Sequence, residues 1–345
     1  MAGRKLPTVN RKESLRRMTE LKLMVTGKLY FCPDTLASLL QHCPELTSLD
    51  MPMYYDDRET YGSFLDNVVQ SCPKLKHLGR NDPAPDHGCM MFNFLDFMKE
   101  NTLESFYFLE YTEGPESVCW TFDRHKESVK SIILDECNTI GINFLMALIG
   151  FPALEVFSIS LNPWTASQFQ ELKLPLTLDK AQEALGKDNI DFSGPIPYWM
   201  TKLEKFYRQN GALSNLRILE LRVTVEMNVR DSNRRRIIYS DKTLVGMLTL
   251  EDRVTGRPGW SLLLQGLRNL EELHGSFNLD AMAPGFEFGQ GEADWIVEHW
   301  HKLKFVELYT QLEEAPVIFP PPVQSMVQRL PGLWVVGKYK NPHWD

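Results

Sequence analysis

The chain has little of what secreted and membrane proteins usually carry. Only six of its 345 residues are cysteines, and no two of them form the C-x-x-C pair typical of zinc and redox centres. The sequence contains no N-x-S/T glycosylation sequon, no apolar run of membrane-spanning length and no opening signal peptide. We therefore expect a cytoplasmic or nuclear protein with no membrane partner, whose cysteines serve as small core residues.

A convergent set of catalytic or metal-binding residues is also missing. The eight histidines are scattered, and His299 and His301 are two residues apart, a spacing that points them to different sides of a helix. The glycine-rich segment 285–291 lacks the lysine of a phosphate-binding loop and the flanking strand and helix of a dinucleotide site. Because an enzyme needs a nucleophile, a base or a metal in one place, we predict no enzymatic activity, no cofactor and no metal.

Positive charge is scarce outside the first residues. The chain has a net charge of −8, yet residues 1–28 hold eight Lys or Arg against two Glu, so the remainder carries −14. An acidic body argues against nucleic acid as a ligand, because phosphate binding needs a basic stripe. We interpret the basic leader, residues 1–17, as a solvated cap. A nuclear-import signal, a transit peptide and a partner contact are the alternatives.

Apolar residues, by contrast, recur in a fixed template. In six stretches, the positions 10, 7, 6 and 3 residues before an anchor leucine are all apolar, which is one face of an α-helix. After each anchor the pattern changes to the L-x-x-L-x-L alternation of a short strand. The six anchors are Leu46, Leu75, Leu154, Leu270, Leu303 and Leu333. Weaker anchors are Met18, Leu103, Val129 and Leu216.

Most neighbouring anchors are 25 to 33 residues apart, which is the period of a repeat protein. A helix face followed by a strand at this period predicts an α/β leucine-rich-repeat solenoid (a horseshoe) of about ten strand–helix units. Its parallel sheet lies inside and its helices lie outside. We expect the solenoid to cover 18–345, with insertions at about 163–212 and 224–259. Alternatively, each long gap hides one degenerate repeat, because the anchor intervals there are about twice the usual length.

In such a solenoid the function must be sought on a long surface, because the residues between the leucines line the inner curve of the sheet. Carboxylates run along this lining together with aromatic side chains, which are residue types that carry protein–protein interfaces. We therefore predict a protein partner for this concave face. The candidate binding residues are Asp50, His77, Tyr107, Asp135, Glu220, Arg222, His274, Phe305, Glu307 and Tyr309.

The repeated unit resembles that of F-box/leucine-rich-repeat proteins, most closely their large fungal expansions. The likeness rests on the segments Cys43–Leu49 and Cys72–Leu78, which read CPELTSL and CPKLKHL, and on FPAL and LPGLW at residues 151–154 and 330–334. In that family an F-box docks to the Skp1 adaptor of a cullin ubiquitin ligase, and the repeats select the substrate. The first 17 residues of this chain are too short for an F-box. Either the sequence is a partial chain or it retains recognition alone.

The resemblance thus implies non-enzymatic protein recognition, as the substrate-recognition part of an SCF-type ubiquitin ligase with Skp1 and cullin machinery as further partners. The alternative is a standalone scaffold or regulatory inhibitor with no link to ubiquitin.

Overall fold

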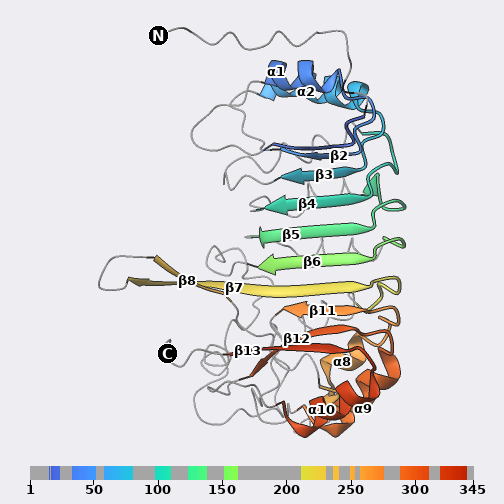
Figure 1. Cartoon of the computed structure of the whole chain (residues 1–345), viewed down its shortest axis with the longest axis vertical. Helices are drawn as coiled ribbons and strands as arrows, with labels where there is room; N and C mark the ends of the chain where they lie inside the picture. Colours follow the sequence, from blue (N-terminus) through green and yellow to red (C-terminus); the bar gives the residue numbers. More distant parts are fainter. Residues whose placement is uncertain are drawn as a thin grey trace.

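Ten parallel strands lie side by side along the long axis of the molecule in the computed structural model (Figure 1). The structure describes residues 15, 17–23, 33–51, 58–80, 98–109, 123–137, 151–161, 211–230, 236–240, 249–252, 257–275, 288–310 and 319–339. The ten strands are β1 (Glu20–Lys22), β2 (Ser48–Asp50), β3 (His77–Arg80), β4 (Ser105–Leu109), β5 (Ser131–Cys137), β6 (Val156–Leu161), β7 (Ile218–Arg230), β11 (Glu272–Gly275), β12 (Phe305–Thr310) and β13 (Trp334–Tyr339).

Each strand pairs in parallel with the next of these ten along the chain, so the sheet is a stack of rungs in sequence order. In the first nine rungs the first paired residue lies two positions after a sequence anchor: Ser48 follows Leu46, and His77, its partner in the next rung, follows Leu75. The template therefore marks both the strands and their register. The fold class is confirmed as a leucine-rich-repeat solenoid.

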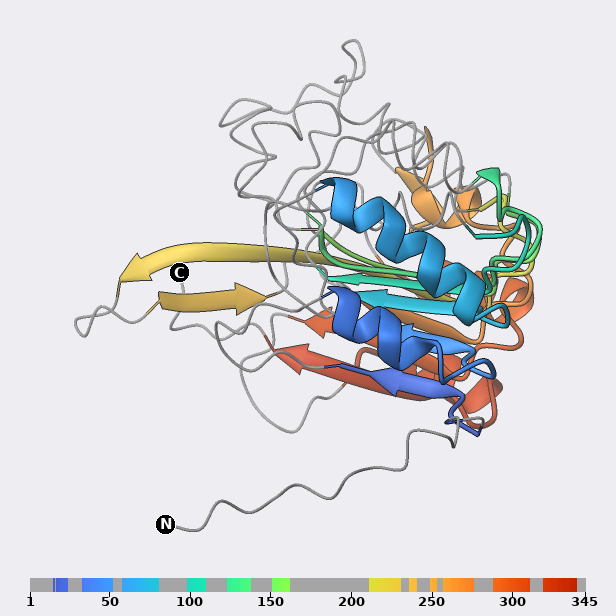
Figure 2. The same cartoon turned by 90° about the horizontal axis from the view of Figure 1, so that it is seen from above.

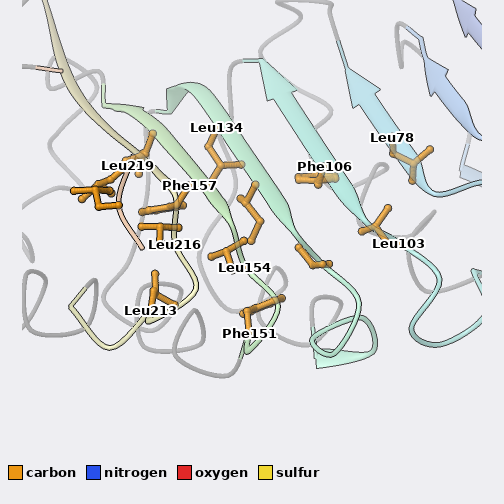
Figure 3. Packing of buried hydrophobic residues seen from close by; sticks show 14 of the residues in the cluster. Leu78, Leu103, Phe106, Leu134, Phe151, Leu154, Phe157, Leu213, Leu216 and Leu219 are labelled. Carbon is orange, nitrogen blue, oxygen red and sulfur yellow. The ribbon is translucent and has the colours of Figure 1, made fainter. Parts of the chain in front are cut away.

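The buried side of the sheet is a row of one apolar residue per rung, which we call the core row. Figure 3 shows four of its members, Leu78, Phe106, Phe157 and Leu219, pointing to the same side of their strands. Each of these side chains is at most 2% exposed. The complete row is Leu21, Leu49, Leu78, Phe106, Ile132, Phe157, Leu219, Leu273, Val306 and Val335. Because each rung covers the next, the rungs bury their apolar side chains only as a stack.

The described helices place apolar side chains in the same buried cluster as the core row. They are α1 (Pro33–Leu40), α2 (Arg58–Ser71), α8 (Trp260–Leu263), α9 (Gln290–His299) and α10 (Pro321–Arg329). Figure 2 shows α1 and α2 on one side of the strands. The template positions of α1 and α2 are mostly buried, for example Leu36, Leu40, Leu65 and Val68. Val327 of α10 is an exception to the expected helix face, because it is 38% exposed.

Cysteine residues at equivalent places in two repeats support the core interpretation. Cys43 and Cys72 are free thiols and are at most 1% exposed. The Cys72 thiol lies against the Cys43 carbonyl oxygen at 3.6 Å. Burial, followed by the neighbouring Cys43, raises the pKa of Cys72 to about 12, so this thiol stays protonated and unreactive at neutral pH.

The two long anchor gaps add no rung to the main sheet. β6 pairs directly with β7, where Val156 lies opposite Ile218, and β7 pairs directly with β11, where Ile218 lies opposite Glu272. The first gap lies almost entirely outside the described residues. The second contains the end of β7 and three short strands. These are β8 (Arg236–Ser240), which pairs antiparallel with β7, and the antiparallel pair β9 (Glu251–Asp252) and β10 (Arg257–Pro258).

Two glycines allow the turns before β7 and β11 to touch. A Cβ atom on Gly211 would lie 1.9 Å from the Leu263 carbonyl oxygen, and one on Gly266 would lie 2.0 Å from the Gly211 carbonyl oxygen. Only glycine fits such backbone contacts. In the same region β7 and β8 extend beyond the other strands as a two-stranded ribbon (Figure 2).

The last rung differs from the others by one residue. Phe305 pairs with Trp334, which follows its anchor Leu333 by one position instead of two. Gly332, immediately before that anchor, has a φ of +88°, a left-handed conformation that favours glycine. As a result Val335 enters the core row, and Trp334 takes the place on the other side of the sheet that the sequence template assigns to Val335.

Among the described residues, no helix combines the length and apolar character that crossing a membrane requires.

Candidate functional site

The sheet face opposite the core row, which we call the inner face, carries two rows of side chains. Both rows run across the strands, because the pairs at these positions keep one register from β1 to β11. β5 and β6 shift register only beyond Leu134. The first row is Glu20, Ser48, His77, Ser105, Ser131, Val156, Ile218, Glu272, Phe305 and Trp334. The second row is Lys22, Asp50, Gly79, Tyr107, Ile133, Ser158, Glu220 and His274.

Six of the predicted binding residues fall on these rows, but they do not form one compact site. Asp50, Tyr107, Glu220 and His274 share the second row. His77 and Phe305 lie on the first row. At roughly 4.8 Å per rung, the six steps from β2 to β11 span about 29 Å. A single small ligand cannot touch both ends, so these residues do not converge on one small-molecule site.

At the β1–β4 end, polar side chains of the inner face bind one another. Lys22 lies 3.3 Å from an Asp50 carboxylate oxygen, and the Asp50 side chain is only 19% exposed. Gly79 leaves the room for this carboxylate, since a Cβ there would lie 3.0 Å from Asp50 Cγ. On the neighbouring row, His77 Nδ1 and Ser105 Oγ share a 2.8 Å hydrogen bond. Lys22, His77 and Ser105 thus have partners within the solenoid, whereas Asp50 Oδ1 is buried and has no hydrogen-bond partner among the described residues.

The middle rungs are more apolar. Ile133, Val156 and Ile218 stand on consecutive or neighbouring strands and are half-buried. Ser158 Oγ donates a 2.6 Å hydrogen bond to Glu220 Oε2 across the β6–β7 pair, which orients that carboxylate. This part of the face is therefore mainly aliphatic, with one carboxylate held in place.

At the β11–β13 end, aromatic rings stack in a line across three strands. His274 stacks on Phe305 with ring centroids 4.4 Å apart, and Phe305 meets Trp334 edge-to-face at 5.6 Å. His274 Nε2 is also 2.8 Å from Glu272 Oε2. Trp334 itself is 67% exposed. This end offers a partner a large, well-held aromatic surface next to a carboxylate.

The other four predicted residues do not add a described, exposed side chain to the inner face. Glu307 of β12 is 3% exposed, so little of it faces solvent. Asp135, Arg222 and Tyr309 have strand backbone within β5, β7 and β12, and their side chains lie outside the described residues. Partner binding by the ten predicted residues stays a prediction.

A second polar feature, which we call the charge ladder, runs where the strands begin. The residue directly after each anchor alternates in sign over seven rungs: Lys76, Glu104, Lys130, Glu155, Arg217, Glu271 and Lys304. Lys76 and Lys130 both bind Glu104, at 2.7 and 3.0 Å. Arg217 contacts Glu155 at 3.4 Å and Glu271 at 2.9 Å, and Lys304 binds Glu271 at 2.6 Å.

These contacts shift the titration of Glu104 and Glu271, which each bind two cations. Hydrogen bonds from Lys76 and then Lys130 lower the pKa of Glu104 to about 2. Hydrogen bonds from Arg217 and then Lys304 lower the pKa of Glu271 to about 2. Glu104 and Glu271 therefore stay charged near neutral pH. The alternating signs of the ladder compensate one another, so it presents no strong charge of one sign to a partner.

Sequence reasoning missed both the ladder and Trp334, although each leaves a signal. The ladder is visible as alternating charge at one template position. This alternation passes from Glu155 to Arg217 and from Arg217 to Glu271 without a missing step, across both long gaps. Trp334 was missed because the template places it beside the turn, and only the shorter last rung brings it onto the inner face.

No group of three or more His, Cys, Asp or Glu side chains within the described ranges could hold a metal ion.

Comparisons with known proteins identify no family for this chain. No protein-family model matches the chain, and a search of curated proteins finds no match. Among solved structures, the leucine-rich repeat-containing protein LegL7 from Legionella pneumophila is similar over 94% of this chain and 84% of its own, at 10% identity and a TM-score of 0.43. The Rad7 and Elc1 complex in yeast is similar over 89% of this chain and 78% of that chain, at 14% identity and a TM-score of 0.31. Strand pairing, and not these similarities, defines the chain as a leucine-rich-repeat solenoid.

Proposed function

We propose that this protein is a non-enzymatic recognition module that holds a partner protein on the inner face of its sheet. The observation that carries the proposal is the alignment of two side-chain rows over successive rungs, which ends in an exposed aromatic line. Nine steps between ten rungs give a face about 43 Å long. That length suits an interface of standard size.

The inner face is a better candidate than the charge ladder. Ladder side chains pair with one another from rung to rung, so a partner would have to break these pairs in order to bind. Aromatic residues such as Tyr107, Phe305 and Trp334 are the types that most often dominate interface energies. Half-exposed aromatic rings on a rigid strand also lose little entropy when they are covered.

The resemblance of the C-P-x-L units supports a narrower role, which is substrate recognition for an SCF-type ubiquitin ligase in the cytoplasm or nucleus. The full-length gene product, expressed with an affinity tag, tests this role through co-purification with Skp1 and a cullin. Recovery of both proteins is the expected result. A tagged protein that captures its partner without either one would instead favour a standalone scaffold or inhibitor.

Paired variants test the proposed surface. Proximity labelling or affinity capture with the wild type first defines the partners. Tyr107→Ala and Phe305→Ala should then reduce capture while thermal melting changes little, because both side chains lie on the inner face and not in the core row. Val327→Ala and Lys74→Ala are matched controls, since both residues are exposed and lie away from this face. Unchanged capture by both aromatic variants would contradict the proposal.

A further inference from the structure

Four residues at the β11–β13 end form a distinct corner of the inner face, which we call the aromatic corner: Glu272, His274, Phe305 and Trp334. Glu272, Phe305 and Trp334 occupy the same row on three adjacent strands. His274 is two residues further along β11 and stacks on Phe305. Each member therefore has a fixed neighbour within the corner.

Packing holds the indole of Trp334 in place without covering it. Phe305 is clamped between the His274 ring at 4.4 Å and the Trp334 ring at 5.6 Å, the latter at an interplanar angle of 87°. Trp334 thus rests on the corner by an edge-to-face contact while it remains 67% exposed. Among the described large hydrophobic residues that are exposed, it exceeds Leu15 at 42% and Val327 at 38%. We take this exposed ring, held by Phe305, as the candidate contact surface of the corner.

The charge around this surface is negative. Glu272 has a side chain that is 41% exposed, and its one described partner is His274. Glu220, on the strand next to β11, adds a second carboxylate to the same face. No lysine or arginine occurs among the described inner-face side chains of β7, β11, β12 and β13, whereas the side chains of Arg222 of β7 and Lys338 of β13 lie outside the described residues. The chain as a whole carries −8.

Aromatic faces flanked by carboxylates favour one kind of ligand group, which is a planar cation. A guanidinium stacks on an indole and accepts carboxylate pairing in the same plane. The spacing adds a second constraint: two rung steps between Glu272 and Trp334 amount to about 10 Å. Three residues of an extended polyproline II segment cover about 9 Å and return to the same side.

From these observations we propose that the aromatic corner binds an extended basic segment of the partner that carries two arginines three residues apart. One guanidinium stacks on Trp334 and the other pairs with Glu272. This inference rests on the proposed function, since it names the chemistry of the partner that the inner face would hold.

Fluorescence anisotropy with a labelled peptide tests the inference directly. The probe is a Gly/Pro-rich peptide with two arginines in an R-x-x-R arrangement. The control peptide has glutamine at both positions. The full chain should bind the arginine peptide more tightly than the glutamine peptide, and added salt should weaken the binding.

Variants of the chain then test whether the arginine peptide binds at the aromatic corner. Trp334→Ala should weaken binding of the arginine peptide by about 2- to 30-fold, the range of cation–π contacts, and Trp334→Phe should recover part of the loss. Glu272→Gln should weaken it by about 1.5- to 5-fold, as expected for an exposed ion pair. Val327→Ala and Glu127→Gln are matched controls that remove an exposed apolar group and an exposed charge elsewhere, and both should bind as the wild type does.

Two results would overturn the inference. The first is equal binding of the arginine and glutamine peptides by the wild type. The second is an equal loss of binding in Glu272→Gln and Glu127→Gln together with none in Trp334→Ala, which would show only general attraction to an acidic protein. Either result would leave partner capture through Tyr107 and Phe305 intact, so the proposed function would be judged separately.

Discussion

The two ends of the inner face share one architecture and differ in what their side chains bind. At the β1–β4 end, Lys22 pairs with Asp50 and His77 pairs with Ser105. At the β11–β13 end, rings stack in a line that ends in the exposed Trp334. The first end uses its polar groups to hold neighbouring rungs together. The second holds an apolar surface in place and leaves it uncovered.

This difference shows that position on the inner face is not enough to make a binding residue. Asp50 and His77 stand in the same rows as the aromatic corner, yet their nearest polar partners belong to the solenoid. Glu272 of the aromatic corner is likewise paired, with His274, so the two ends differ in their rings. A paired carboxylate must give up an interaction before it can bind a partner, whereas the exposed Trp334 ring only loses water. We therefore expect binding energy to concentrate at the C-terminal end.

The largest expected effect concerns the core row, where the two ends should behave alike. Leu78→Ala and Leu273→Ala each remove a buried side chain beneath one end, and each should lower the free energy of unfolding by about 2–5 kcal/mol. Urea unfolding followed by circular dichroism measures both. A loss below about 1 kcal/mol at one end alone would show that the rungs do not share one continuous core.

Acid should weaken both halves of the charge ladder. Hydrogen bonds from lysine and arginine side chains lower the pKa values of Glu104 and Glu271 to about 2, below the ordinary value of 4.5. Each carboxylate therefore contributes stability above pH 4.5 that is lost as the pH falls toward 2. Urea midpoints measured from neutral to acid pH should therefore fall steeply below about pH 4.5. Glu104→Gln and Glu271→Gln should each flatten that fall. If both variants followed the wild-type curve, the ladder would have no role in stability.

Reversing the charge of one ladder residue also tests whether the charge ladder stabilises the fold. Arg217→Glu places a carboxylate between Glu155 and Glu271, so the urea midpoint should drop at low salt and recover in part at high salt. Lys74→Glu, which faces a single carboxylate at Glu45, is the matched control and should lose less. An equal loss in the two variants would show that the ladder is no more than a set of independent pairs.

The smallest expected effect lies at the N-terminal end. His77→Ala removes one hydrogen bond with Ser105 and should cost about 0.5–1.5 kcal/mol of stability. It should leave capture of the partner within about twofold of the wild type, as an interface position without a hot-spot contact does. Affinity capture beside Phe305→Ala gives the comparison. A greater loss of capture in His77→Ala than in Phe305→Ala would reverse the assignment of the two ends.

The sequence predicted the repeat architecture because its signal is local. Each anchor and the apolar positions before it lie within one repeat, and stacking preserves their order. The ten anchors precede the ten rungs, and Leu46 and Leu75 stand in the same relation to their strands. Cys43 and Cys72 lie in the core as their positions imply.

Contacts between rungs were harder to predict, because they depend on residues that lie far apart in sequence. Asp50 was a candidate binding residue, and its pairing with Lys22 appears only when β1 lies beside β2. The exposure of Trp334 depends on a single missing residue in the last repeat. The repeat pattern of this sequence carries no information on the surface of a partner, so recognition must be tested by binding.

Direct contact between rungs on either side of the first long gap is the claim on which the remainder depends. The Glu155 carbonyl oxygen accepts hydrogen bonds from the backbone N–H groups of Arg217 and Ile218, at 2.7 and 3.0 Å. Neighbouring strands bring Cα atoms to about 4.8 Å, within the range of a disulfide, whereas strands two rungs apart lie near 9.6 Å and outside it. The test is mild oxidation of Glu155→Cys/Arg217→Cys, with peptide mapping by mass spectrometry. We expect this variant to form the cross-link and Glu155→Cys/Glu271→Cys to form none. No cross-link in the first variant would place another rung in the gap and contradict the stack described above.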